Sequence, residues 1–259
     1  MAGVLLDLDG VLYVGDEAVP GAADAVAWLA AEGIPHRYLT NTTSRPRSAI
    51  VEKLRRLGID ADAAEILTPA VAASDWLRER GIRTPALFVP EATAAEFAGL
   101  DVPEPDAEAG AGAVVVGDLG PAWDFATLNR AFRLLMSDPE TPLIALGLTR
   151  YWRAEDGLRM DAGGFVRALE YATGRDAVVL GKPDARFYGA AVAALGVDPG
   201  AAVMVGDDVR TDVGGAQDAG LTGVLVRTGK FSPADLDGAV TPDAVIDSIA
   251  ELPGWWAGR

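Results

Sequence analysis

Short apolar runs alternate with amphipathic stretches along most of this chain. The runs have the length and the Val and Leu content of buried parallel strands, and the stretches between them have the character of helices. The predicted strands are Val4–Leu6, Ile34–Thr40, Ala86–Val89, Ala113–Val116, Leu143–Leu146, Ala177–Leu180, Ala201–Val205 and Thr222–Val226. The predicted helices are Pro20–Ala31, Pro46–Leu57, Pro69–Arg80, Thr127–Met136, Phe165–Thr173, Ala185–Leu195 and one ending at Ala219. Strands separated by helices predict an α/β fold with a doubly wound parallel sheet, which is a Rossmann-like core.

The composition changes in the middle of the chain. Residues 84–112 are rich in Pro, Glu, Asp, Gly and Ala, and the strands and helices that follow them predict a second αβ unit over residues 82–177. The chain is thus expected to form a core from residues 1–81 and 178–259, with an inserted αβ domain between these two segments.

Polar residues follow several of the predicted strands. In an open α/β sheet, ligands bind at the carboxyl ends of the strands. These groups are Asp7 and Asp9, then Thr40 and Asn41, then Lys182, then Asp207, Asp208 and Asp212. Two neighbouring carboxylates suit a divalent cation with acid/base chemistry, but Asp and Gly are also common in solvated turns. Each group alone leaves both a functional site and a solvated turn open. Four such groups at strand ends are much less expected by chance than any one of them.

Composition removes several classes of function. The formal net charge of -16 argues against nucleic acid and anionic membrane as partners. The absence of cysteine excludes disulfides and thiolate chemistry, and a single histidine without a G-x-S-x-G sequence disfavours a serine triad. No apolar run reaches the ~18 residues of a membrane span, and no signal peptide is recognisable, so a cytoplasmic location is expected.

The strand-end groups resemble the motifs of the haloacid dehalogenase superfamily, which read DxD, Ser/Thr-Asn, Lys, and GDD with a later Asp. All four occur here in that order. The long stretch between Asn41 and Lys182 implies a class II cap domain over residues 82–177. The segments TNTTS, RYW, ALEYATG, VLGKP and VRTGKF resemble a class IIA branch that contains phosphatases of pyrophosphate, phospholysine and phosphohistidine. One of those phosphatases lacks an Asp at the position of Asp9, so this chain departs from it there.

The resemblance implies catalytic roles for three of these residues and a metal site beside them. Asp7 would be the nucleophile that forms an aspartyl phosphate, and Asp9 would be the general acid and base. Lys182 would neutralise the nucleophile and the phosphate. A Mg²⁺ ion would be held by Asp7, the backbone carbonyl of Asp9, and Asp207.

The resemblance also implies supporting residues. Thr40, Asn41 and Lys182 would bind phosphoryl oxygens. Arg150, in the loop 147–151, is either a second contact to an anionic substrate or a solvated loop arginine. Asp208 and Asp212 either orient Lys182 or a metal-bound water without contacting the metal themselves, or are ordinary carboxylates at a helix N-terminus.

The function expected from the resemblance is a Mg²⁺-dependent phosphatase acting on a small phosphorylated substrate. Pyrophosphate or a phosphorylated amino acid is the alternative substrate, and a homodimer is left open. A non-catalytic regulatory or binding protein is the alternative of another class. Hydrolysis of a carbon–halogen bond would need no metal, and a phosphomutase usually carries its cap after the first motif, so both are disfavoured.

Overall fold

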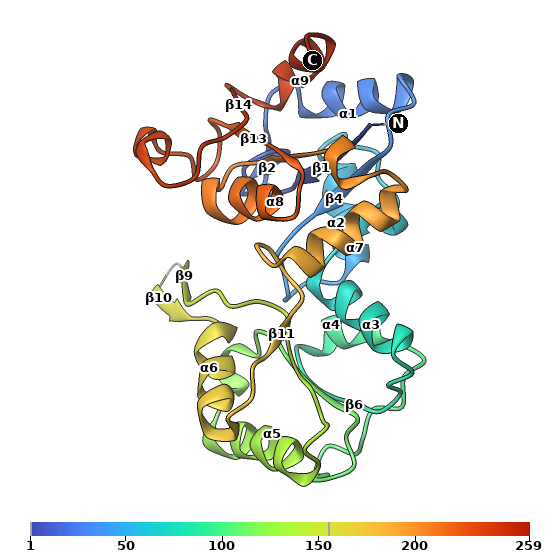
Figure 1. Cartoon of the computed structure of the whole chain (residues 1–259), viewed down its shortest axis with the longest axis vertical. Coiled ribbons are helices and arrows are strands. Elements are labelled where there is room, and N and C mark those ends of the chain that lie inside the picture. The colour runs from blue at the N-terminus through green and yellow to red at the C-terminus, as the bar shows by residue number, and fades with distance from the viewer. Residues whose placement is uncertain (1, 155) are drawn as a thin grey trace. The chain divides into compact units, whose positions relative to one another are not determined.

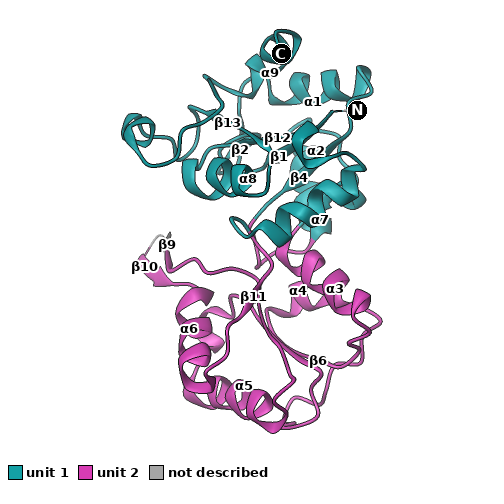
Figure 2. Cartoon of the chain, viewed as in Figure 1, with its two compact units in different colours: residues 1–40, 47–67, 182–259 teal, residues 41–46, 68–181 magenta. Residues whose placement is uncertain are grey.

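The computed structural model describes residues 2–154 and 156–259, which form two compact units (Figures 1 and 2). The first unit contains the chain up to Thr40, then Arg47–Leu67 and Lys182–Arg259, and the second contains Asn41–Pro46 and Thr68–Gly181. Each unit has its own parallel sheet, so the predicted α/β class with parallel sheets is confirmed. The division into a catalytic core and a cap remains a proposal.

The sheet of the first unit is wholly parallel and has the strand order β14-β13-β12-β1-β4-β5. Its strands are β1 (Gly3–Asp7), β4 (His36–Leu39), β5 (Ile66–Leu67), β12 (Ala202–Gly206), β13 (Thr222–Val226) and β14 (Ala244–Ile246). A central β1 explains why its residues are apolar on both faces: all five residues of β1 are buried. The structure adds β5 and β14, which are too short to give a periodic signal in the sequence.

Helices and turns connect these strands. They are α1 (Ala22–Ala31), α2 (Arg47–Arg56), α7 (Ala185–Leu195), α8 (Gly215–Asp218) and α9 (Leu252–Ala257), a π-helical turn η5 (Val209–Gly214), and the 3₁₀ turns η1 (Ala63–Glu65), η4 (Pro199–Ala201), η6 (Pro233–Asp237) and η7 (Ile249–Glu251). Leu29 of α1, Leu54 of α2 and Leu252 of α9 share a buried cluster with Val4 and Leu6 of β1. These helices therefore cover one face of the sheet, and Figure 1 shows α1 and α9 beside each other.

A small hairpin follows β1 directly. Its strands β2 (Tyr13–Val14) and β3 (Glu17–Ala18) pair antiparallel, and neither was predicted from the sequence pattern. Two-residue strands show neither a period nor an apolar run, so a sequence pattern cannot detect them. The helix predicted to end at Ala219 also differs, because it begins as the π-helical turn η5 before α8.

The second unit has a parallel sheet of order β11-β8-β7-β6 and an antiparallel hairpin. Its strands are β6 (Pro85–Phe88), β7 (Ala113–Val116), β8 (Leu143–Ala145), β9 (Tyr151–Ala154), β10 (Gly157–Met160) and β11 (Val178–Val179). Its helices are α3 (Pro69–Glu79), α4 (Glu91–Ala94), α5 (Phe125–Ser137) and α6 (Ala162–Thr173), with the 3₁₀ turns η2 (Ala95–Phe97) and η3 (Gly120–Ala122). One buried apolar cluster joins this sheet to α5 and α6. None of the described helices combines the length and apolarity needed to cross a membrane.

Candidate active site

Lys182 joins two carboxylates that are far apart in the sequence. Its Nζ lies 2.6 Å from Oδ1 of Asp7, at the end of β1, and 2.7 Å from Oδ1 of Asp212, in η5. All three side chains are buried. A buried ammonium with two carboxylates carries a net negative charge, which favours a further cation close by.

Asp212 is held by three donors. Besides Lys182, its Oδ2 accepts the backbone N–H groups of Asp207 and Asp208, each at 3.1 Å. The hydroxyl of Tyr188 donates to the carbonyls of Thr211 and Asp212, at 2.7 and 3.1 Å. Both carboxylate oxygens of Asp212 therefore have hydrogen-bond partners inside the protein, and its main effect is to orient Lys182 and the end of β12.

Asp207 has one oxygen bound and one without a partner. Its Oδ2 accepts the backbone N–H of Lys230 at 2.7 Å. Its Oδ1 is buried and has no hydrogen-bond partner in the described part of the chain. A buried carboxylate oxygen without a donor is costly unless a cation or water takes that place.

Two glycines allow the backbone to approach Asp207. Gly10 and Gly229 both have positive φ angles, of 90° and 64°. A Cβ at Gly10 would lie 1.9 Å from Oδ2 of Asp207, and one at Gly229 would lie 2.1 Å from the same atom. The hydroxyl of Thr228 also donates to the carbonyl of Gly10. The loops that follow β1 and β13 are thus packed directly on the Asp207 carboxylate.

Burial changes the acidity of the cluster. It raises the pKa of Asp7 to about 7, against the attraction of Lys182, and it raises the pKa of Asp207 to about 6. Burial disfavours the charge of Lys182, but Asp212 and Asp7 outweigh it and hold the pKa of Lys182 above its usual value. The site therefore keeps its lysine charged, while Asp7 and Asp207 would release their protons to solvent when a cation binds.

The donor set fits a hard divalent cation. One carboxylate oxygen from each of Asp7, Asp207 and Asp212 lies within 4.8 Å of the others. Oδ1 of Asp207 also has no hydrogen-bond partner among the described residues. Carboxylate oxygens are the ligands that Mg²⁺ prefers. Because Asp212 already accepts three hydrogen bonds, Asp7 and Asp207 are the side chains best able to hold a metal.

The other predicted residues lie as follows. Asp9 lies two residues after Asp7, and its side chain is exposed. Thr40 is buried directly after β4, and its N–H donates to the carbonyl of Leu67 at 3.2 Å.

Asn41 and the exposed Arg150 belong to the second unit, so their roles toward substrate stay predictions. Oδ1 of Asp208 accepts the N–H groups of Arg210 and Thr211, which is the N-cap arrangement left open by the sequence.

Three residues that the sequence reasoning did not assign also contact the site. Tyr188 supports Asp212, and Thr228 and Lys230 contact Gly10 and Asp207 through the bonds described above. The segment VRTGKF at the end of β13 was noticed as part of the resemblance, but nothing in a strand-end Thr-Gly-Lys indicates where its backbone N–H will point.

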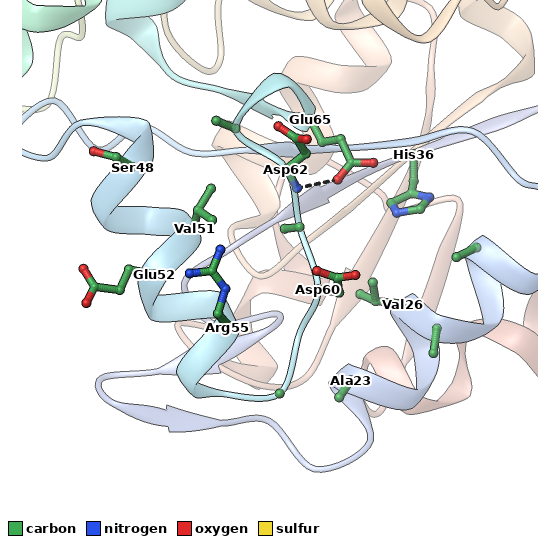
Figure 3. A pocket seen from close by; sticks show the side chains of 15 residues that line it. Ala23, Val26, His36, Ser48, Val51, Glu52, Arg55, Asp60, Asp62 and Glu65 are labelled. Atoms are coloured by element: carbon green, nitrogen blue, oxygen red, sulfur yellow. Dashed lines mark hydrogen bonds between the residues drawn. The ribbon is translucent and has the colours of Figure 1, made fainter.

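A groove between α1 and α2 lies apart from this chemistry. It has a volume of about 1100 Å³ and contains none of the predicted site residues. Figure 3 shows His36, Asp60 and Arg55 around it, and the Glu65 carboxylate that accepts the N–H of Asp62 at 2.8 Å. His36 forms a bond of 3.0 Å with the carbonyl of Ile34, which is a structural role.

The chain is similar to known proteins along most of its length. The family model described as haloacid dehalogenase-like hydrolase matches residues 4–102, and a second, described as HAD-hydrolase-like, matches residues 179–252. Phospholysine phosphohistidine inorganic pyrophosphate phosphatase of Rattus norvegicus is 41% identical over 254 residues, which cover 96% of this chain and 92% of that protein. Haloacid dehalogenase-like hydrolase domain-containing protein 2 of Bos taurus is 41% identical, with 92% and 88% covered.

Solved structures of two phosphatases are similar over nearly the whole chain. The p-nitrophenyl phosphatase from Archaeoglobus fulgidus is 28% identical with a TM-score of 0.89, and 98% of each chain is covered. The 4-nitrophenylphosphatase from Thermotoga maritima is 26% identical with a TM-score of 0.86, and 98% of this chain and 97% of that one are covered.

Proposed function

This chain belongs to the haloacid dehalogenase-like hydrolase family, and we propose that it is a Mg²⁺-dependent phosphatase of small phosphorylated compounds. The resemblance inferred from the sequence motifs is thereby confirmed at the level of the family, and its relatives include named phosphatases. The observation that carries the proposal is the buried group of Asp7, Lys182, Asp212 and Asp207, in which one carboxylate oxygen has no partner among the described residues.

In the proposed reaction, a carboxylate oxygen of Asp7 attacks phosphorus and the bond to the leaving oxygen breaks. The exposed carboxyl of Asp9 gives its proton to that oxygen, so the leaving group departs as a neutral alcohol. The aspartyl phosphate on Asp7 is then attacked by water, whose proton returns to Asp9, and phosphate is released. Lys182 favours the ionised form of Asp7 and orients it, while Asp212 holds Lys182 in place.

The metal would be held by Asp7, Asp207 and the backbone carbonyl of Asp9. When bound, Mg²⁺ supplies positive charge that lessens repulsion between the carboxylates and the phosphate. Thr40 and Asn41 would bind phosphoryl oxygens, and Arg150 would contact the leaving group. This local positive charge reconciles an anionic substrate with a chain whose formal net charge is -16.

The names of similar proteins suggest a second candidate for the substrate class. The name of the relative from Rattus norvegicus contains pyrophosphate, phospholysine and phosphohistidine, which makes a phosphoanhydride or a phosphorylated amine a second candidate. The names of the similar solved structures contain p-nitrophenyl or 4-nitrophenyl phosphate, which is a synthetic aryl ester.

The test is hydrolysis by the purified chain with Mg²⁺ or with excess EDTA. The substrates are p-nitrophenyl phosphate, an alkyl phosphate, pyrophosphate and phospholysine. We expect turnover with Mg²⁺ and none with EDTA, with activity restored by adding Mg²⁺ back. Undiminished turnover after EDTA would contradict the metal requirement. A lack of turnover on every phosphorylated compound would favour a binding protein on this fold.

A further inference from the structure

We infer that Lys53, on α2, is a positioning residue that holds the loop of Asp9 for proton transfer; this inference rests on the proposed function. The Nζ of Lys53 donates to the carbonyl of Gly15 at 2.7 Å and lies 3.7 Å from the centre of the Tyr13 ring. Gly15 and Tyr13 both belong to the β2–β3 hairpin, which immediately follows the Asp9 loop.

The Lys53 side chain is mostly enclosed, with 12% of its surface exposed. An ammonium over an aromatic face gains electrostatic attraction that grows as water is removed. Asp16, at 3.9 Å, is almost fully exposed and adds little to this contact. The carbonyl of Gly15 and the ring of Tyr13 are thus two contacts through which Lys53 acts on the hairpin.

The hairpin has few hydrogen bonds of its own. Each of its strands has two residues, and an isolated two-stranded hairpin is marginal in water. Tyr13 shares a buried cluster with Ile50 and Leu54 of α2, whereas the turn at Gly15 is exposed. Lys53 thus connects the anchored helix α2 to the exposed turn of the hairpin.

Tyr13 passes this restraint to the backbone around Asp9. The N–H of Gly10 donates to the carbonyl of Tyr13 at 2.7 Å, and the N–H of Tyr13 donates to the carbonyl of Leu8 at 3.3 Å. These bonds bracket Asp9, since one involves the residue before it and the other the residue after it. The side chain of Asp9 is exposed, so its direction depends largely on this backbone.

A general acid depends strongly on position. Proton transfer by a placed side chain contributes about 10²–10⁴-fold, and a misplacement of about 1 Å can cost about 10²-fold. Loss of the restraint should therefore slow the step in which Asp9 acts, while the metal and phosphate contacts of the other residues are retained.

The experiment compares Lys53→Met, which keeps the length and loses the charge, with Lys53→Arg and with Arg56→Met. Arg56 lies on the same helix but is exposed and pairs only with Glu52, at 3.8 Å, among the residues described. For each variant, kcat and KM are measured on an alkyl phosphate and on p-nitrophenyl phosphate, whose leaving group needs little protonation. Amide hydrogen exchange is measured at Gly10 and Tyr13.

For Lys53→Met we expect kcat on the alkyl phosphate to fall by about 10- to 100-fold, with a smaller fall on the aryl phosphate and little change in KM. Exchange at Gly10 should be at least about tenfold faster. Lys53→Arg should recover most of both effects, and Arg56→Met should show neither. Equal losses on the two substrates, or unchanged exchange at Gly10, would overturn the inference.

The same measurements would give a different result if the chain were not a phosphatase. In that case the wild-type chain would hydrolyse neither substrate, and the exchange at Gly10 alone would decide whether Lys53 holds the Asp9 loop. Faster exchange with an unchanged ratio of the two kcat values in an active enzyme would show a purely structural contact, which also contradicts a positioning role.

Discussion

Two acids of one short segment, Asp208 and Asp212, have different environments. Asp208 caps a turn through backbone N–H groups, whereas Asp212 is buried and bound to Lys182. Removing one partner of a buried ion pair is costly, because the remaining charge stays in a poorly solvated place. Removing a half-buried cap such as Asp208 is cheaper, because water can reach the freed N–H groups.

We therefore expect Asp212→Ala to lower the free energy of unfolding by about 3–5 kcal/mol, and Asp208→Ala by about 0.5–2 kcal/mol. Both are measured by urea denaturation of the purified variants. Equal losses would mean that Asp212 is merely another cap. Asp212→Ala should also lower activity more than Asp208→Ala, because only Asp212 contacts Lys182.

Asp7→Asn is the direct test of the nucleophile. The amide keeps the shape of the side chain but cannot form an acyl phosphate in the same way, so turnover should fall at least about a thousandfold, or about 4 kcal/mol in the barrier. Asp24→Asn, on the exposed side of α1, is the matched control and should be fully active. Residual activity of Asp7→Asn within about tenfold of wild type, with circular dichroism unchanged, would rule out the assignment.

At the scale of elements, the loops after β1 and β13 approach each other closely at Asp207. Gly10 and Gly229 permit this, because each has a positive φ and no room for a side chain. The π-helical turn η5 lies at the same edge of the sheet and contains Asp212, whose carboxylate accepts a hydrogen bond from Lys182. Irregular backbone is thus present at the sheet edge where the candidate site lies.

Gly229→Ala separates close approach from backbone strain. Gly58, after α2, has a similar positive φ of 79° but open space around its Cβ position. Gly58→Ala should lose about 1–2 kcal/mol of stability through strain alone, with activity unchanged. Gly229→Ala should lose more and should also lower kcat by at least about tenfold, because its Cβ would displace Asp207. Calorimetry and steady-state kinetics check this, and identical behaviour of the two variants would disprove it.

At the scale of the whole molecule, the buried carboxylates link stability to pH and metal. The folded-state pKa values of Asp7, about 7, and Asp207, about 6, lie above the ordinary value of 3.8. Without metal, the contribution of these groups to stability is complete below about pH 4 and is lost as pH rises through 6 and 7. Metal binding requires the ionised forms, so it becomes more favourable over the same range.

We expect the rise in Tm caused by saturating Mg²⁺ to be larger at about pH 7.5 than at about pH 5. Thermal unfolding with and without Mg²⁺, at constant ionic strength, measures it. Asp207→Asn should remove most of the effect at both pH values. A Mg²⁺-induced shift that is independent of pH would mean that Asp7 and Asp207 are not the groups that ionise on binding.

The sequence alone predicted the fold class and most of the parallel strands. Apolar runs of four or five residues, such as Ala113–Val116, give a strong signal because a parallel strand is buried on both faces. The hairpins β2–β3 and β9–β10 were missed, since their strands of two to four residues contain no such apolar run. The motif order also indicated the family, because the chemistry of the site demands fixed residue types at strand ends.

Tertiary structure alone decided how the predicted polar residues pair. Asp208 and Asp212 are equally acidic and lie in one segment, yet only Asp212 reaches Lys182. Strand order places β1 beside β12, and the turn η5 then turns Asp212 back toward the sheet edge. Local sequence patterns report periodicity and burial within one element, whereas a contact such as Lys182–Asp7 depends on the order of strands, which no local pattern contains.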